Sequence, residues 1–402
     1  MKKIISLVLN NFKNDSRVLK ENISLQKAGY NVQVVALWED GLKEFEIIQN
    51  IPVHRIKLKS KNWSKNKLIQ LIKYLEFVFR VVKKYKNFDI IHCNDLNTLP
   101  IGVIIKKFFN KNVKIVYDAH EYETEINGLK GFQKSLTKIL EKSLIKYADK
   151  VITVSNSIAN EYTKLYNIEK PAVVLNTPLY KEIDKKDIFR EKFNLDKDKT
   201  IFLYQGGLSS GRGIEILLET FKDIEEGGKR EKEEGNFNLQ PSTLALQPCI
   251  VFMGYGELEQ LVKEYATKYE NIYFHPAVSP DILLDYTSCA NFGVHMAQSH
   301  CLSYLYALPN KTFEYIMAEL PIIVTNLPEL GRLASDNNIG ILIEKNTKES
   351  FKNAITKAIN LDKTQYQELI ENIRKAKKKY CWEKQEKILI NTYKGVLNVN
   401  KI

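Results

Sequence analysis

The chain alternates short, strongly apolar runs with longer segments whose apolar residues recur every three or four positions. The short runs are rich in Ile and Val, as in Lys3–Leu9, Asn31–Leu37 and Val113–Tyr117, and they predict strands buried on both faces. The longer segments, such as Ser16–Ala28 and Asn66–Tyr85, predict amphipathic helices. This alternation is typical of a parallel sheet covered by helices, so we predict an α/β fold.

The alternation occurs twice, which predicts two βαβ domains facing across a cleft. The first is expected over residues 1–177 and the second over 200–380, with the polar, proline-containing segment 176–199 as the linker. Residues 381–402 form one more helix. In open α/β sheets ligands bind at the carboxyl ends of the strands, so we expect the functional site there.

Residues 225–248 interrupt the second domain between a helix and a strand. They combine charged residues and glycines with a repeated Leu-Gln-Pro, and they are longer than an ordinary connection. We interpret them as a flexible surface insertion that carries no chemistry.

Composition excludes several classes of protein. Of 402 residues, 44% are apolar and 27% are charged, which is the balance of a folded chain rather than a disordered one. No apolar run is long enough for a transmembrane helix, and Ile4–Leu9 is too short for a signal peptide. Five scattered cysteines indicate a reducing compartment. We therefore expect a cytoplasmic protein.

The net charge of +12 is concentrated in one place. Residues 55–86 contain eleven Lys or Arg and one acid, Glu76, and their helical half has an unusually wide apolar face. A second helix repeats a lysine every four residues: Lys134, Lys138, Lys142, Lys146 and Lys150. Two interpretations stay open, a solvated face of a lysine-rich protein or peripheral contact with an anionic membrane surface through 55–86 and 134–150. The sequence contains no recognisable nucleic-acid-binding module, so nucleic acid is not an expected partner.

One cluster of potential metal ligands does not have the spacing of a metal site. It comprises Cys289, His295, His300 and Cys301, without paired C-x-x-C or H-x-x-x-H. We interpret these residues as small buried thiols and loop histidines, and we expect no metal.

A glycine-rich turn follows the strand Ile201–Gln205. Its residues that could admit a phosphate are Gly206, Gly207, Gly211 and Gly213, together with Arg212. Glycines let the backbone approach a ligand, the following helix start favours an anion, and a guanidinium matches phosphate. The alternative is a plain turn with a surface arginine. A second turn at Gly254 has an incomplete dinucleotide pattern.

The segment Ala307–Pro321 predicts a helix that begins at Pro309. Its start, Asn310–Thr312, offers the N–H groups of Lys311 and Thr312 to a phosphate. Glu314 lies one turn in and could accept two hydrogen bonds from a vicinal diol such as a ribose. The alternative is an ordinary amphipathic helix with an acid in its first turn.

Polar residues also follow three predicted strands of the first domain. They are Asp15 and Arg17, Asp95, and the run Asp118, His120 and Glu121. His120 can donate or accept a proton near neutral pH and has acids beside it. Three polar strand ends on one rim indicate a binding site more strongly than a single histidine does.

These motifs, taken together and in order, resemble the retaining, nucleotide-sugar-dependent glycosyltransferases of the GT-B fold, glycosyltransferase family 4. The resemblance spans nearly the whole chain. It rests on Asp15-Ser16-Arg17-Val18, Gly29-Tyr30-Asn31-Val32, Asp118-Ala119-His120-Glu121, Ala148-Asp149 before Val151–Ser155, Asn176-Thr177-Pro178, Gly206-Gly207…Gly211-Arg212-Gly213, Gly254-Tyr255-Gly256 and Leu308-Pro309-Asn310-Lys311…Phe313-Glu314-Tyr315.

The resemblance implies two Rossmann-like domains and an enzyme that needs no cofactor beyond its donor, a UDP- or GDP-linked sugar. The second domain would hold the nucleotide, with Glu314 on the ribose and Arg212 on the diphosphate. The first domain would hold a glycan or lipid-linked acceptor of cell-envelope synthesis, with His120 near the transferred sugar. The tail helix around Trp382 would pack back on the first domain.

The chain departs from the family pattern at two positions. The first of the family's paired glutamates would fall at position 306, where this chain has Tyr306, and an arginine often found before the phosphate lysine is Gly207. We therefore keep two alternatives to a glycosyltransferase: a nucleotide-sugar epimerase of the same architecture and a non-catalytic nucleotide-sugar-binding protein.

Overall fold

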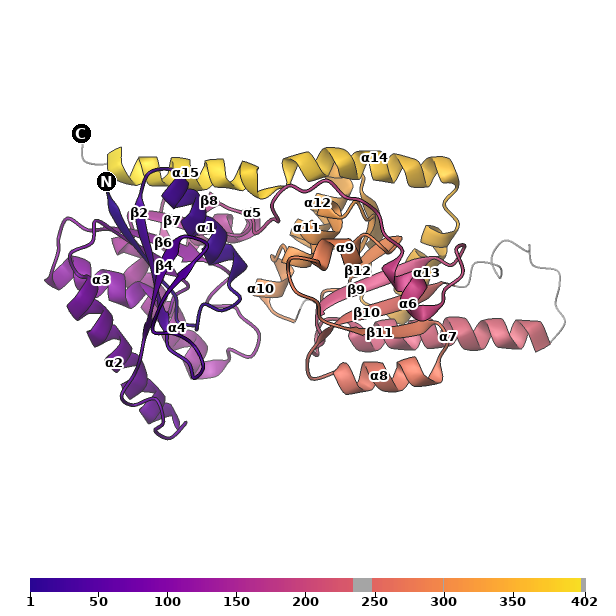
Figure 1. Cartoon of the computed structure of the whole chain (residues 1–402), viewed down its shortest axis with the longest axis horizontal. Coiled ribbons are helices and arrows are strands. Elements are labelled where there is room, and N and C mark those ends of the chain that lie inside the picture. The colour runs from indigo at the N-terminus through magenta and orange to yellow at the C-terminus, as the bar shows by residue number, and fades with distance from the viewer. Residues whose placement is uncertain (234–247, 299, 399–402) are drawn as a thin grey trace. The chain divides into compact units, whose positions relative to one another are not determined.

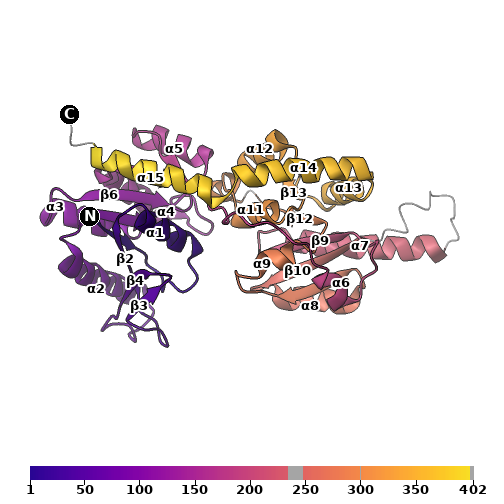
Figure 2. The same ribbon diagram turned by 45° about the horizontal axis from the view of Figure 1, so that its top comes forward.

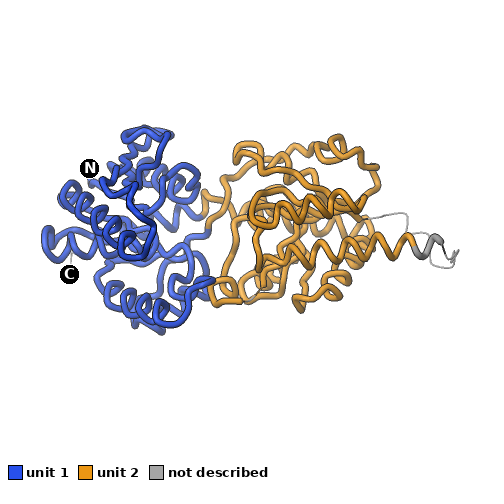
Figure 3. The backbone as a smooth tube through the Cα atoms, turned by 90° about the horizontal axis from the view of Figure 1, so that it is seen from below, with its two compact units in different colours: residues 1–175, 385–402 blue, residues 176–384 orange. Residues whose placement is uncertain are grey.

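The structure is a computed structural model that describes residues 1–233, 248–298 and 300–398. The chain divides into two compact units, residues 1–175 with 385–402 and residues 176–384 (Figure 3). The segment 176–199, predicted as a linker, belongs to the second unit. Its helix α6 (Ile188–Phe193) buries Phe189, whose ring lies 5.9 Å from that of Tyr286, so the segment is anchored rather than free.

Unit 1, whose residues 1–175 run from indigo to magenta in Figure 1, contains one eight-stranded sheet in the order β3-β4-β2-β1-β5-β6-β7-β8. All neighbouring strands are parallel except β3 and β4, which form an antiparallel hairpin at the edge. The strands are β1 (Lys3–Leu7), β2 (Asn31–Leu37), β3 (Phe45–Ile48), β4 (Ile51–Ile56), β5 (Ile90–Asn94), β6 (Lys114–Ala119), β7 (Lys150–Thr153) and β8 (Ala172–Val173).

Helices cover both faces of this sheet. They are α1 (Ser16–Lys27), α2 (Lys67–Tyr85), α3 (Leu99–Phe108), α4 (Gly131–Leu144), α5 (Asn156–Tyr166) and the tail helix α15 (Trp382–Asn398). Helix α3 packs against β5 and β6 and against both α2 and α4, so these three share one face. On the other face α15 runs beside α1 (Figure 2), and its Tyr393 hydroxyl lies 2.5 Å from His92 Nδ1 in β5.

Unit 2 contains a fully parallel six-stranded sheet in the order β11-β10-β9-β12-β13-β14. The strands are β9 (Ile201–Gly207), β10 (Cys249–Tyr255), β11 (Ile272–Pro276), β12 (Phe292–His295), β13 (Ile322–Thr325) and β14 (Gly340–Ile343). Its remaining helices are α7 (Ile214–Glu233), α8 (Glu259–Lys268), α9 (Leu283–Thr287), α10 (Leu302–Leu305), α11 (Asn310–Met317), α12 (Pro328–Asn337), α13 (Lys348–Ile359) and α14 (Lys363–Lys379). Phe202, Phe221 and Phe292 form the centre of its core.

Two parallel α/β sheets confirm the predicted fold class. In each sheet the strand order reverses beside the first strand, between β1 and β5 in unit 1 and between β9 and β12 in unit 2. Such a reversal leaves a crevice at the carboxyl ends of the two strands, where ligands of doubly wound folds bind. The predicted site residues gather at these two positions.

The predicted insertion at 225–248 begins later than the sequence suggests. Helix α7 continues to Glu233, so residues 225–233 are helical. The buried Glu225 carboxylate explains the continuation, because it accepts a hydrogen bond from the Asn271 backbone N–H at 3.1 Å and pairs with Lys229 at 2.6 Å. Residues 234–247 lie outside the described residues.

Across 1–233, 248–298 and 300–398, the structure contains no helix with both the length and the apolar character needed to cross a membrane.

Candidate nucleotide and acceptor sites

The end of β9 brings the predicted phosphate-binding residues of unit 2 together. Gly206 has φ +110°, and a Cβ there would lie 3.5 Å from Lys311 Cε. A Cβ on Gly207 would lie 3.4 Å from Arg212 Nη1. The two glycines therefore lie directly against the two cations, and their lack of side chains keeps both charged groups close to the open backbone at the strand end.

The other predicted glycines shape the backbone around this point. Gly213 has φ +77°, and a Cβ there would come within 2.7 Å of the Met296 carbonyl oxygen. A Cβ on Gly254 would come within 1.9 Å of the Gly206 carbonyl oxygen on the neighbouring strand. A Cβ on Gly211 would lie 3.4 Å from His300 Cδ2. These glycines permit close approach of protein segments, which is a structural rather than a ligand-binding reason for their presence.

Lys311 is a buried cation without a hydrogen-bond partner. Its side chain begins at the first turn of α11, and its ammonium lies 3.9 Å from the centre of the Tyr204 ring. Only 6% of the residue is exposed, and Nζ makes no hydrogen bond within the described structure. Burial and the nearby Arg212 lower the pKa of Lys311 to about 7, while Glu314 acts in the opposite direction. A desolvated cation beside a second cation is stabilised by an anion, so the site has the electrostatics of an anion-binding pocket.

His295, at the end of β12, adds an unpaired polar group to the same cluster. The side chain is buried and both ring nitrogens lack hydrogen-bond partners among the described residues. Burial, Lys311 and Arg212 together hold the pKa of His295 well below its usual value, so the imidazole is neutral. A neutral imidazole offers one donor and one acceptor. We weighed His295 from the sequence only as a metal ligand, and nothing in its local sequence indicated this environment.

Glu314 lies on the same side of unit 2 as the two cations, as the prediction required. Its Oε2 accepts a hydrogen bond from Gln205 Nε2 at 2.5 Å, and Gln205 Oε1 in turn accepts one from Thr287 Oγ1 at 2.7 Å. This chain of hydrogen bonds orients the carboxylate, and a carboxylate is a suitable acceptor for the two hydroxyl groups of a diol. We refer to Tyr204, Arg212, His295, Lys311 and Glu314 as the donor cluster.

One predicted phosphate contact is wrong. The Thr312 backbone N–H donates to the Pro309 carbonyl oxygen at 3.0 Å, because the first turn of α11 is tight, so it is not available to a ligand. The Thr312 hydroxyl is buried without a hydrogen-bond partner in the described structure and is the group that this residue can offer. Asn310, two residues before Thr312, is exposed.

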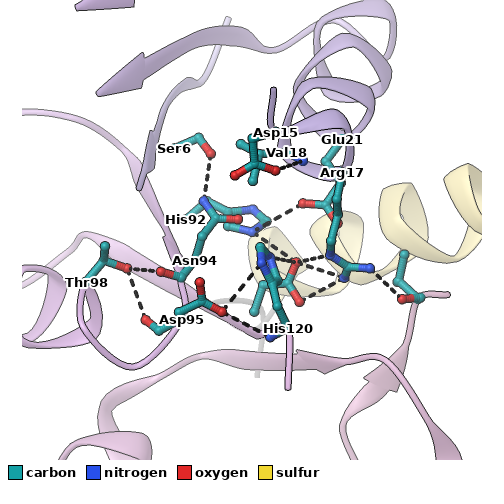
Figure 4. A network of polar contacts seen from close by, with 12 residues as sticks. Ser6, Asp15, Arg17, Val18, Glu21, His92, Asn94, Asp95, Thr98 and His120 are labelled. Atoms are coloured by element: carbon teal, nitrogen blue, oxygen red, sulfur yellow. Dashed lines mark hydrogen bonds and ion pairs between the residues drawn. The ribbon is translucent and has the colours of Figure 1, made fainter. Parts of the chain in front are cut away.

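In unit 1 three of the predicted residues, Arg17, Asp118 and His120, belong to a largely buried ionic network (Figure 4). Asp15 caps α1 by accepting a hydrogen bond from the Val18 N–H, which places Arg17 on the inner side of the helix. Arg17 Nη2 lies 2.9 Å from Asp118 Oδ1 and 3.0 Å from Oδ2, and Nε lies 3.1 Å from Glu21 Oε1. Arg17 Nη1 also donates to the Val174 carbonyl oxygen at 2.9 Å.

His120 belongs to this network and lies between two carboxylates. Its Nε2 is 3.3 Å from Asp118 Oδ2 and its Nδ1 is 3.5 Å from Asp95 Oδ1. Burial alone would lower the pKa of His120, but Asp118 and Asp95 outweigh it and raise the pKa to about 9. His120 is therefore protonated at neutral pH and can donate hydrogen bonds or stabilise negative charge, but cannot accept a proton in that state.

Two predicted acceptor residues require correction. Arg17 and Asp118 are 4% and 0% exposed and paired with each other, so neither can contact an acceptor, and they instead position His120. Burial would raise the pKa of Asp118, but Arg17 and His120 hold it well below its usual range. Asp15, Asp95 and Glu121 are partly or fully exposed and stay candidates.

The sequence analysis missed two members of the network, Glu21 and His92. Glu21 follows Arg17 by one helical turn, a spacing that could have indicated an ion pair. Burial raises the pKa of Glu21 to about 8. His92 Nε2 lies 3.6 Å from Asp118 Oδ2. Since His92 sits inside an apolar strand, the sequence gives no sign that its ring reaches a carboxylate.

Three potential ligand atoms, from Glu21, Asp118 and His120, lie within 4.8 Å of one another. Arg17 already pairs with Asp118 and contacts Glu21, and both Glu21 and His120 are largely protonated at neutral pH. Since a metal ligand must be deprotonated, these residues are better described as an ion-pair network than as a metal site.

Comparison with protein families identifies both halves of the chain. Residues 23–178 match the family model described as Glycosyltransferase Family 4, and residues 185–376 match Glycosyl transferases group 1. An uncharacterized glycosyltransferase of Methanocaldococcus jannaschii is 23% identical and aligns over 92% of this chain and 91% of its own. The chitobiosyldiphosphodolichol beta-mannosyltransferase of Kluyveromyces lactis is also 23% identical, over 84% of this chain and 78% of its own.

Solved structures share the fold at low sequence identity. Sucrose-phosphate synthase from Thermosynechococcus elongatus superposes with a TM-score of 0.78 and 17% identity, covering all of both chains. An Anabaena protein, HepE, solved in complex with UDP-glucose, superposes with a TM-score of 0.71 and 14% identity over 98% of this chain and all of its own.

Proposed function

Since this chain is a glycosyltransferase of the GT-B fold, with a family 4 region followed by a group 1 region, we propose that it transfers a hexose-type sugar from a nucleotide diphosphate sugar to a glycan or lipid-linked acceptor, with retention of anomeric configuration. Unit 2 binds the donor and unit 1 the acceptor. The proposal assigns no metal and no cofactor beyond the donor to the reaction.

The donor cluster is the observation that carries this proposal. Lys311 is buried, has no hydrogen-bond partner in the described structure, and has Arg212 as its charged neighbour. Burying such a group without an anion is costly, and a diphosphate supplies two negative charges in the required place. Glu314, oriented by Gln205, accepts hydrogen bonds from the ribose hydroxyl groups. Two cations that suit a diphosphate and a carboxylate that suits a ribose diol belong to the same cluster. This combination fits a nucleoside diphosphate better than an isolated phosphate.

The same groups support the bond-breaking step. The bond between the anomeric carbon and the diphosphate oxygen breaks, and that oxygen keeps the electron pair. A bond from the anomeric carbon to the acceptor oxygen forms, and the acceptor hydroxyl's proton passes to the leaving diphosphate. Negative charge grows on the leaving diphosphate, and Arg212 and Lys311 stabilise it without reorganisation because they are fixed beforehand. His120, protonated at neutral pH, donates a hydrogen bond to the transferred sugar and does not act as the base.

Two comparisons support the classes of donor and acceptor. The Anabaena structure contains UDP-glucose, which makes a uridine-linked hexose a reasonable first donor to test. The name of the Kluyveromyces relative specifies a dolichol-linked diphosphate acceptor, which supports a lipid-linked acceptor for this chain.

The test is a transfer assay with isotopically labelled UDP- and GDP-sugars and a lipid-linked glycan fraction, after a thermal-shift screen selects the donor that binds. We expect a new glycoside that keeps the donor's anomeric configuration by NMR, and no turnover by Arg212→Ala. An altered donor sugar in the absence of acceptor would instead indicate an epimerase. Nucleotide binding without any product would indicate a non-catalytic binding protein.

A further inference from the structure

Helix α4 packs on unit 1 through its polar side. Its one buried residue is Glu141, whose carboxylate accepts hydrogen bonds from the hydroxyl groups of Tyr117, Tyr162 and Tyr166 at 2.6, 2.7 and 2.5 Å. In an ordinary surface helix the apolar side faces the core and the charged side faces water. Here a glutamate anchors the helix to the sheet and to α5.

The apolar side of α4 consequently faces outward. Phe132, Leu136, Ile139 and Leu140 are spaced by three and four residues, so they lie on one side of the helix. Their exposed fractions are 81%, 54%, 66% and 40%. Four exposed aliphatic and aromatic side chains on one side of a helix indicate an interaction surface.

Helix α2 also exposes an apolar side, because it carries two apolar sides and only one of them is buried. Its inner side, which includes Phe77 and Val81, is buried against unit 1. Its outer side is exposed from Leu68 to Phe79 and comprises Leu68, Leu71, Ile72, Leu75 and Phe79, at 38% to 68%. A helix that packs only on its own domain needs one apolar side.

The two exposed apolar sides belong to one layer of unit 1. Helix α3 lies between α2 and α4 and packs against both (Figure 1). The α3 end contributes Phe108 and Phe109, which are 74% and 54% exposed. We call the outward apolar residues of α2 and α4, with this phenylalanine pair, the apolar face.

Positive charge borders the apolar face. Residues 55–86 carry eleven Lys or Arg against one acid, Glu76, although Arg55 is buried and paired with Glu46. Helix α4 adds the exposed Lys142, together with Lys134 and Lys138, which both pair with the Glu125 carboxylate at 2.6 Å. Glu76 accepts hydrogen bonds from the Lys59 and Ser60 N–H groups and pairs with Arg80, so it offsets one of these positive charges and leaves the segment strongly cationic. Exposed apolar side chains among lysines match a lipid interface, with acyl chains beneath anionic headgroups.

We propose that unit 1 docks on an anionic membrane surface through the apolar face. The apolar side chains of α2 and α4 enter the headgroup region, and the flanking lysines pair with lipid phosphates. A second copy of the chain is a poorer occupant, because two such faces would bring their lysines together. The proposal does not depend on the proposed transfer reaction, since vesicle binding requires neither donor nor acceptor.

The test is co-sedimentation of the full chain with vesicles of phosphatidylcholine alone and with 30% phosphatidylglycerol. We expect binding to the anionic vesicles and little to the neutral ones. Replacing two exposed residues, Leu136→Ser with Ile139→Ser, is expected to weaken partitioning by at least about tenfold, since each side chain loses its transfer into an apolar environment. Lys142→Gln is expected to weaken it by about fivefold.

Matched controls are Ile282→Ser, an exposed apolar residue of unit 2, and Lys357→Gln on α13, both expected to bind as the wild type does. Because the substituted side chains are exposed, we expect the variants to keep the circular dichroism spectrum and the thermal unfolding temperature of the wild type. These two measurements verify that each variant is folded. Equal binding to neutral and anionic vesicles, or wild-type binding by the α4 variants, would overturn the proposal. Lipid-independent dimers that the α4 substitutions dissociate would also overturn it, in favour of a second copy.

Discussion

The Lys311 ammonium lies 3.9 Å from the centre of the Tyr204 ring and makes no hydrogen bond within the described residues. The ring face supplies a weak cation–π attraction that partly offsets the desolvation of the ammonium. The neighbouring Arg212 acts against it, and the result is a lysine whose pKa is about 7 in the ligand-free protein. Because the pKa of Lys311 lies near neutral pH, we expect donor binding to be coupled to protonation of its ammonium group.

Nucleoside diphosphate binding is expected to take up a proton between about pH 7 and 8.5. Lys311 is partly neutral there, and a bound diphosphate raises its pKa by favouring the charged form. Affinity should therefore fall as pH rises above 7. Isothermal titration calorimetry in two buffers of different ionisation enthalpy measures the uptake, and Lys311→Met should abolish it. Equal uptake by this variant and the wild type would assign the proton to another group.

Glu314 is expected to recognise the ribose diol. Glu314→Ala should weaken UDP or GDP binding by about tenfold, the value of a charge-assisted hydrogen bond. The wild type should also prefer the ribonucleotide over its 2′-deoxy analogue, and the variant should lose that preference. The control is Glu344→Ala, at the far side of the sheet after β14. If the variant still discriminates, the diol is bound elsewhere.

His120 is expected to titrate near pH 9, as an NMR titration of its ring Cε1–H can show. Asp95→Asn should lower this pKa because Asp95 is one of the two carboxylates that raise it, whereas Asp40→Asn, at an 81% exposed side chain, should not. The raised pKa stabilises the folded state fully below about pH 6.5, and this contribution is lost as pH rises through about 9. His120→Gln should remove that part of the pH dependence of the free energy of unfolding.

Glu141 is expected to be the main anchor of α4. Glu141→Ala leaves three tyrosine hydroxyls without their acceptor and should lower the free energy of unfolding of unit 1 by about 3 kcal/mol. Glu161→Ala on α5, a partly exposed residue, should change it by less than about 0.5 kcal/mol. Urea unfolding followed by tyrosine fluorescence measures both. A small effect of the first substitution would mean that other contacts hold the helix.

The sequence predicted the strands that are buried on both faces, because Ile and Val runs such as β1 and β2 have no other common explanation. It did not reveal β3, where the exposed Phe45 and Ile47 alternate with Glu46 at the sheet edge. Helix α12 was missed although Leu330, Leu333 and Ala334 have helical spacing and Pro328 starts it. Short elements with few apolar residues give weak periodicity.

The orientation of α4 and the environment of His295 could not be predicted for a physical reason. An amphipathic pattern shows that a helix has two sides but not which one packs, and only the three tyrosines brought by β6 and α5 make a glutamate the inward residue. His295 becomes neutral because the fold buries it and because Lys311 and Arg212 converge on it, and all three effects lower its pKa. Such effects depend on tertiary packing, whereas Arg212, Lys311 and Glu314 could be chosen from their motifs.

The most direct test of the central claim is the dissociation constant of UDP and GDP, and of their hexose conjugates, for the wild type and for Arg212→Ala, by titration calorimetry at pH 7 and fixed salt. We predict saturable binding of one of the two nucleotides, weakened about tenfold to a hundredfold by the substitution, with Arg332→Ala, a 55% exposed arginine on α12, unchanged. Binding of the nucleotide by Arg212→Ala with wild-type affinity, or no binding of either nucleotide by the wild type, would contradict the assignment of the diphosphate to the donor cluster.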